Sequence, residues 1–185
     1  MTIVSSSTDV RPGGRWRNWG RSVEARPQFV ARASSADEVA DAVRFARERG
    51  LAVKPIGAGH SFTSIAATDG LQLDISGIDG VLAVDGANVT FGAGTNLYQL
   101  PALFAPLGLG LQNMGDIDRQ TLAGATSTGT HGTGSAFGGL AARIRAATLV
   151  TADGSILRVS ATENAELLPA VALGLGALGV LVDVT

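Results

Sequence analysis

The sequence VKPIGAGHSFT occupies residues 53–63 and joins a short apolar run to a glycine-rich loop that carries a histidine. Residues 51–56 (LAVKPI) are predicted to form a strand that ends where Gly57 begins the loop. Glycines allow consecutive backbone N–H groups to turn toward one centre, which forms a nest for an anion such as a pyrophosphate. The loop around His60 therefore indicates either a phosphate-binding site or a plain turn with a structural histidine.

A second loop has the same character, since residues 128–134 (TGTHGTG) hold the other histidine of the chain, His131. Two histidines without a cysteine or a close His spacing make a poor metal site, so we expect no metal. A third cluster, GLGALG at 174–179, matches the G-x-G-x-x-G dinucleotide fingerprint, but a predicted helix precedes it and a strand follows it. That order is the reverse of the fingerprint, which excludes a nicotinamide site there.

Hydrophobic periodicity predicts the regular elements around these loops. The Ser35 to Glu38 spacing is a capping box that begins a helix, and Gly50 is placed to end it. Further helices are expected over 97–104 and 162–175, and strands over 28–33, 51–56, 71–75, 81–84, 88–92, 146–151, 155–159 and 179–184. The strand, helix and strand over 28–56 imply a parallel pair, whereas Asp85-Gly86 and Asp153-Gly154 favour antiparallel hairpins. The fold class is therefore mixed α and β.

Composition limits the class of protein. The 185 residues are 45% hydrophobic and 16% charged, with no cysteine, so we expect a folded domain of one or two lobes without disulfides. No long apolar stretch and no signal-like start occur, so we expect a soluble, cytoplasmic protein without a membrane partner.

Six arginines lie between residues 11 and 32, interleaved with Trp16 and Trp19. Cationic and stacking groups together suit a nucleic-acid arm. The rest of the chain is acidic, so the basic residues do not continue into a surface that would bind the phosphate backbone of a nucleic acid. We therefore expect no nucleic acid, and an irregular segment packed across the body by its two indoles.

Three stretches in register resemble the FAD-binding domain of the vanillyl-alcohol-oxidase (PCMH-type) flavoprotein family: residues 53–63, 115–134 and 175–180. Within that family the sequence is most similar to the sugar-lactone (gulonolactone and arabinonolactone) and alditol oxidases. The resemblance covers residues 17–185 as an FAD-binding domain and leaves 1–16 as an irregular N-terminal segment.

The resemblance implies a two-lobed α+β domain with mixed parallel and antiparallel sheets and FAD between the lobes. His60 matches the histidine that in many members is bonded covalently to the 8α carbon of the flavin. Cofactor-binding residues carried over by position are Ile56, Gly57, Ala58, Gly59, His60, Ser61, Gly115, Asp116, Thr121, Gly124, Thr128, Gly129, Thr130, His131, Gly132 and Val180.

The function implied is oxidation of a CH–OH group of a sugar lactone or alditol. In the family a second domain supplies the substrate site and the base, and this chain stops at Thr185, so we assign no catalytic residue and expect a missing substrate domain or a partner chain. Two alternatives stay open: a flavin-holding module without turnover of its own, and a binder of a nucleotide other than flavin.

Overall fold

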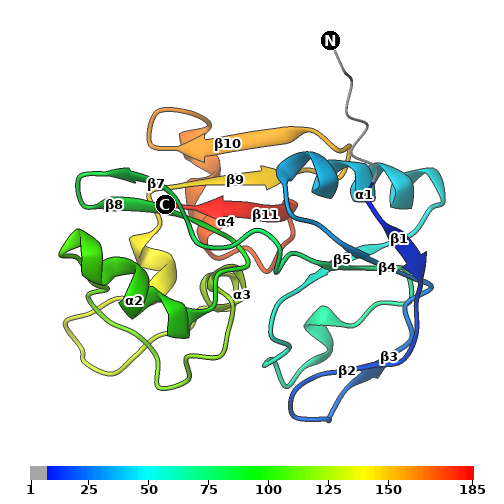
Figure 1. Ribbon diagram of the computed structural model, residues 1–185, viewed down its shortest axis with the longest axis horizontal. Helices are drawn as coiled ribbons and strands as arrows, with labels where there is room; N and C mark the ends of the chain where they lie inside the picture. The colour runs from blue at the N-terminus through cyan, green and yellow to red at the C-terminus, as the bar shows by residue number, and fades with distance from the viewer. Residues whose placement is uncertain (1–7) are drawn as a thin grey trace.

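Two β-sheets form the framework of the protein in the computed structural model, which describes residues 8–185 (Figure 1). The first sheet has the order β1-β4-β6-β5 and consists of β1 (Val10–Pro12), β4 (Phe29–Arg32), β6 (Leu71–Asp74) and β5 (Val53–Ile56). The second has the order β10-β9-β11-β8-β7 and consists of β10 (Ile156–Ser160), β9 (Ala146–Val150), β11 (Val180–Val184), β8 (Asn88–Gly92) and β7 (Val81–Asp85). The expected mixed α+β fold is confirmed, with parallel pairs in the first sheet and antiparallel pairs in both.

The first sheet differs from the expectation in how its strands pair. β4 and β5 run in the same direction, but β6 lies between them and is parallel to both. Leu71 and Leu73 of β6 are fully buried, so the strand with the most completely buried side chains takes the inner position. β1 pairs antiparallel with β4 at the edge of the sheet. The irregular segment expected over 1–16 is therefore wrong at residues 10–12, which form a strand. Residues 1–7 of that segment lie outside the described residues.

Helix α1 (Ala36–Glu48) joins the two halves of the molecule (Figure 1). It begins as expected, because the Ser35 hydroxyl accepts a hydrogen bond from the Glu38 N–H at 3.2 Å. Its buried face, which includes Val39 and Val43, packs against β6 of the first sheet and β9 and β11 of the second. The Arg44 guanidinium also donates to the Gly154 carbonyl in the β9–β10 turn at 3.2 Å.

The other helices are short: α2 (Leu100–Phe104), α3 (Leu122–Ser127) and α4 (Leu168–Ala172). The helix expected over 162–175 is wrong at both ends, since Asn164 is left-handed (φ 50°) and Leu173 leaves the helical region. Helix α3 was not expected, because it lies in a Gly-, Thr- and Ser-rich stretch. It begins at Thr121, whose hydroxyl accepts a hydrogen bond from the Gly124 N–H at 3.3 Å.

A small hairpin of β2 (Trp16–Arg17) and β3 (Glu24–Ala25) lies between β1 and β4 in the chain. Glu24 pairs with Arg15 and Arg17 across it. The expectation that both indoles pack across the body is wrong for Trp19, which is 64% exposed. Among residues 8–185, no helix has the length and apolar character needed to cross a bilayer.

Candidate functional site

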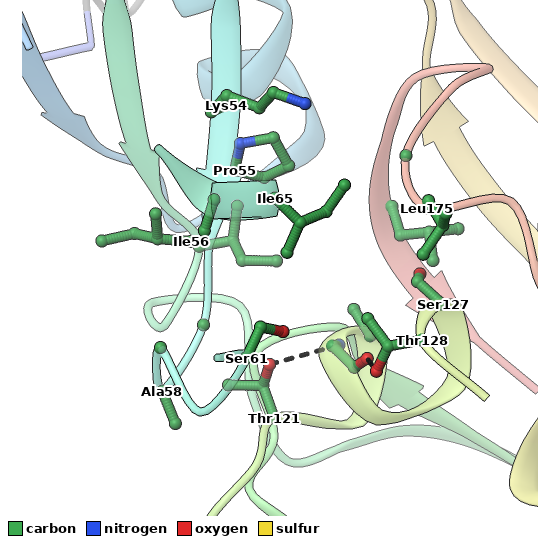
Figure 2. Close-up of a pocket in the computed structure, with 18 of the residues that line it drawn as sticks. Lys54, Pro55, Ile56, Ala58, Ser61, Ile65, Thr121, Ser127, Thr128 and Leu175 are labelled. Atoms are coloured by element: carbon green, nitrogen blue, oxygen red, sulfur yellow. Dashed lines mark hydrogen bonds between the residues drawn. The ribbon is translucent and has the colours of Figure 1, made fainter. Parts of the chain in front are cut away.

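A solvent-open cleft with about 950 Å³ of empty space lies between the two sheets. One wall is β5 and the loop that follows it, the opposite wall is the segment that carries Leu175 and leads into β11, and α3 closes one end (Figure 2). That space includes open solvent, because the cleft is not enclosed. Its walls come from both halves of the molecule, and a ligand reaches them directly from solvent.

Nine of the sequence-predicted site residues line this cleft: Ile56, Gly57, Ala58, Gly59, His60, Ser61, Thr121, Gly124 and Thr128. They come from two segments, 56–61 and 121–128, that β5 and α3 bring together. The other seven predicted residues are not in the lining: Gly115, Asp116, Gly129, Thr130, His131, Gly132 and Val180. Val180 is buried in β11, while Gly179 and Leu181 on either side of it reach the cleft.

The loop at 57–61 presents unused hydrogen-bond donors. Within residues 8–185, the structure gives no hydrogen-bond acceptor to the backbone N–H groups of residues 57–61. Gly59 has a left-handed backbone (φ 67°), which reverses the chain in the middle of the loop. Successive free donors around a left-handed glycine are the elements from which a backbone nest for an anion is built.

The second glycine loop differs from the first, because the donors of residues 128–130 are already used, and residues 131–134, whose N–H groups have no acceptor among residues 8–185, lie outside the cleft lining. The N–H groups of Thr128, Gly129 and Thr130 donate to the carbonyls of Gly124, Thr126 and Ala125 in the last turn of α3. The Thr130 hydroxyl pairs with the Gln120 side chain at 3.0 Å, and Gln120 lines the cleft. This loop therefore packs against α3 and Gln120, which line the cleft, and supplies few N–H groups to the cleft itself.

Charge and polarity differ along the cleft. Its lining contains no Asp or Glu, and its one cation is Lys54 on β5, the single lysine of the chain. Apolar side chains cover the rest of the walls, among them Ile65, Ile75 and Leu181. The cleft thus combines donors and a positive charge with apolar walls, which suits an anionic ligand that also has an apolar part.

Sequence reasoning missed several lining residues. Lys54 had a signal, because it is the only lysine and lies on the strand directly before the glycine loop. Gln120 and Ser127 flank predicted residues of α3. Ile65 lies on a turn of 3-10 helix, Ser64–Ala66, and no periodic pattern distinguishes it.

His60 is half-buried and lies between the cleft and the β2–β3 hairpin. Its ring stacks on Trp19, with the ring centroids 4.8 Å apart and the planes 20° from parallel. His131, by contrast, is exposed, and its Nδ1 lies 2.9 Å from the carbonyl oxygen of Gly132. Only one of the two imidazoles is therefore available to a ligand in the cleft.

The sequence model of the FAD binding domain family matches residues 27–160 of this chain. Those residues include β5, the loop at 57–61 and α3, so the match contains most of the cleft.

Proteins similar to this chain include sugar-lactone dehydrogenases and oxidases. L-gulono-1,4-lactone dehydrogenase of Mycobacterium tuberculosis is 44% identical over 172 residues, which are 92% of this chain and 40% of that protein. L-gulonolactone oxidase of Bos taurus is 38% identical, covering 94% of this chain and 40% of the other. D-arabinono-1,4-lactone oxidase of Eremothecium gossypii is 34% identical, with 92% and 33% covered. The chain thus spans 33 to 40% of the length of these relatives.

Among solved structures, the Physcomitrella patens BBE-like 1 protein superimposes with a TM-score of 0.81 at 24% identity. The match covers 96% of this chain and 41% of that protein. At this identity the likeness establishes the fold alone, and it extends over both sheets.

Proposed function

The chain belongs to the FAD binding domain family, and from that premise we propose that the cleft between its sheets holds FAD. The observation that carries this proposal is the run of five unpaired N–H groups at residues 57–61, in a cleft without a carboxylate. The diphosphate of FAD fits this nest, and Lys54 supplies a positive charge on the same wall. The apolar walls fit the flat rings.

We assign the FAD-binding domain to residues 17–185, which is longer than the stretch that matches the family. β11 and the segment before it, up to Leu181, line the cleft and lie beyond residue 160. At the other end, Asn18 in the β2–β3 hairpin donates to the Ser61 carbonyl at 2.9 Å and so supports the loop. Both ends therefore contribute to the site.

We further propose that His60 is bonded covalently to the cofactor. It is the only imidazole in the cleft lining, and the chain has no cysteine that would serve instead. One imidazole nitrogen of His60 bonds to the 8α carbon in place of a methyl hydrogen, and the imidazole N–H is also lost. The two electrons and two protons released reduce dioxygen to hydrogen peroxide, which balances the reaction.

The reaction class we propose is oxidation of a CH–OH group of a sugar lactone, because the relatives above are named as dehydrogenases and oxidases of sugar lactones. When bound, FAD accepts a hydride from a substrate carbon. The residues of this chain bind and orient the cofactor. The lining of the cleft contains no carboxylate that would act as a base, so proton transfer from the hydroxyl is not assigned to it.

Two measurements on the purified protein test these proposals in turn. A flavin absorption band in the blue establishes the cofactor, and a mass increase of one FAD in the denatured protein establishes the covalent bond. Anaerobic mixing with L-gulono-1,4-lactone and D-arabinono-1,4-lactone then tests oxidation, because substrate turnover bleaches the band. A colourless protein that binds no added FAD would contradict the cofactor assignment, and a coloured protein that neither lactone bleaches is a flavin-holding module.

Lys54→Gln is expected to weaken FAD binding by about tenfold, because a hydrogen bond to a charged group contributes about 1.5 kcal/mol. The measurement is a titration with FAD in a His60→Ala background, where binding stays reversible. Added salt should weaken FAD binding more when Lys54 is present than in the Lys54→Gln variant, since salt screens the attraction of a cation for the diphosphate.

The matched control is Arg158→Gln, which removes the same charge from β10, outside the cleft lining. Its FAD affinity and salt dependence should equal those of the parent. If Arg158→Gln weakens binding as much as Lys54→Gln, the net charge matters and the position of Lys54 does not.

A further inference from the structure

Trp19 lies outside the stretch that matches the family, yet it contacts the residue on which the proposed covalent bond depends. The indole is 64% exposed, so it contributes little to the core. Single exposed aromatic residues are common and mean nothing by themselves. Trp19 differs from such residues in two ways: its backbone is hydrogen-bonded to the glycine loop, and its indole stacks on the ring of His60.

The backbone of Trp19 is tied to the glycine loop. Its N–H donates to the Gly59 carbonyl at 2.8 Å, directly before His60. A side chain at Gly59 would contact this part of the hairpin, since a Cβ there would lie 3.7 Å from the Trp19 nitrogen and 3.5 Å from the Trp16 ring. The hairpin and the loop are therefore in direct contact on both sides of His60.

A buried asparagine makes this junction rigid. Asn18 is 3% exposed, its amide donates to the Ser61 carbonyl and the Ser22 hydroxyl at 2.9 Å, and its side-chain oxygen accepts from the Val23 N–H at 3.0 Å. Asn18 thus closes the hairpin turn and fastens it to the residue after His60. The backbone of Trp19 is therefore held in place, and its indole contacts the imidazole from a fixed position.

We infer that Trp19 is a positioning residue that holds the imidazole plane of His60 for bond formation. At 4.8 Å and 20° the two rings form an offset stack, the preferred geometry for aromatic pairs. The stack restricts rotation of the His60 side chain but leaves the edge of the imidazole, which carries its nitrogens, outside the contact. Bond formation depends steeply on such orientation. This inference rests on the proposed covalent attachment to His60.

The test follows covalent attachment after FAD is added to protein produced without flavin, with acid-stable flavin as the readout. Rates measured over a range of FAD concentrations separate the plateau rate from the half-saturating concentration. In Trp19→Ala the plateau rate should fall about 10- to 100-fold, since small misplacement of a reacting group has effects of this size. The half-saturating concentration and the thermal midpoint should not change, because the backbone hydrogen bond to Gly59 remains.

Two further variants separate the stack from a general loss of structure. Trp19→Phe keeps an aromatic face and should recover most of the plateau rate. Phe62→Ala is the matched control, because Phe62 is 69% exposed and forms a T-shaped pair with Trp19, with the ring centroids 6.4 Å apart, and does not stack on His60. Its plateau rate should equal that of the parent.

Proton NMR of the protein without flavin tests the contact independently of the chemistry. Stacking on an indole moves the His60 ring protons upfield, and Trp19→Ala should abolish this shift. An unchanged plateau rate in Trp19→Ala, an equal loss in Trp19→Phe, or an unchanged shift would each overturn the inference. If the parent protein forms no acid-stable flavin, the covalent proposal fails, and the ring-proton shift alone then decides whether Trp19 positions His60.

Discussion

The His60→Ala protein is expected to bind FAD and to release all of it in acid, whereas the parent protein keeps its flavin after precipitation. The change removes the one imidazole in the cleft lining and leaves the backbone N–H groups of the loop in place. Affinity for FAD should therefore fall only a few-fold, while the covalent fraction falls from nearly all to none. Flavin absorbance in the acid supernatant and the mass of the denatured protein measure both quantities.

His131→Ala is the matched control, because it removes the other imidazole of the chain from an exposed position outside the cleft lining. Its flavin should remain acid-stable. Acid-stable flavin in His60→Ala together with acid-labile flavin in His131→Ala would move the attachment to the second loop. That result would mean that the cleft at 57–61 is not where the flavin ring lies.

Local patterns in the sequence predicted most strands and the first helix, because each of these elements is specified by its own residues. The hairpin turns at Asp85-Gly86 and Asp153-Gly154 and the cap at Ser35 lie where the sequence placed them. The order of strands in the first sheet was not predictable in the same way. The order depends on which strand is buried on both faces. That strand is β6, which follows β5 along the chain but lies between β4 and β5 in the sheet.

Helices in the glycine-rich regions were the least predictable elements. The pattern over 162–175 looked helical, but Pro169 falls in the first turn of α4 and only Leu168–Ala172 is α-helical. The reverse holds for α3, where glycine and threonine gave no helical signal. Thr126 is buried there and its hydroxyl donates to the Leu122 carbonyl at 3.0 Å, so tertiary packing stabilises a helix that propensity does not favour.

The candidate site was predictable where it consists of consecutive residues and not where it consists of opposed walls. The loop at 57–61 has a compositional signature, so its five residues were found together. Ile65 and Leu175 face each other across the cleft in Figure 2, but each is an ordinary apolar residue in its own segment. The contact of Trp19 with His60 joins residues 41 positions apart and also has no sequence pattern.

Gly57→Ala is expected to have the largest effect on the cleft itself. A Cβ at residue 57 would lie 2.2 Å from the Thr121 hydroxyl oxygen and 3.0 Å from its methyl carbon. Since Thr121 also caps α3, neither partner can move without disturbing the loop or the helix. Overpacking of this kind costs about 1–3 kcal/mol, so we expect FAD affinity to fall roughly 10- to 100-fold and stability to fall as well.

Gly110→Ala is the control for a general effect of losing a glycine, because a Cβ at residue 110 would meet nothing within 4 Å. It should bind FAD as the parent does. Affinity is measured in the His60→Ala background, and stability by urea denaturation of the same proteins.

The clash between residues 57 and 121 also predicts that their substitutions are not additive. Thr121→Ala alone loses the cap of α3, which costs about 1 kcal/mol, but it removes both atoms that a Cβ at residue 57 would strike most closely. The double variant should therefore lose less stability and less FAD affinity than the sum of the losses in the two single variants. If the losses are additive, Gly57→Ala acts through the conformation of its own loop. The close approach of β5 to α3 would then not determine the shape of this end of the cleft.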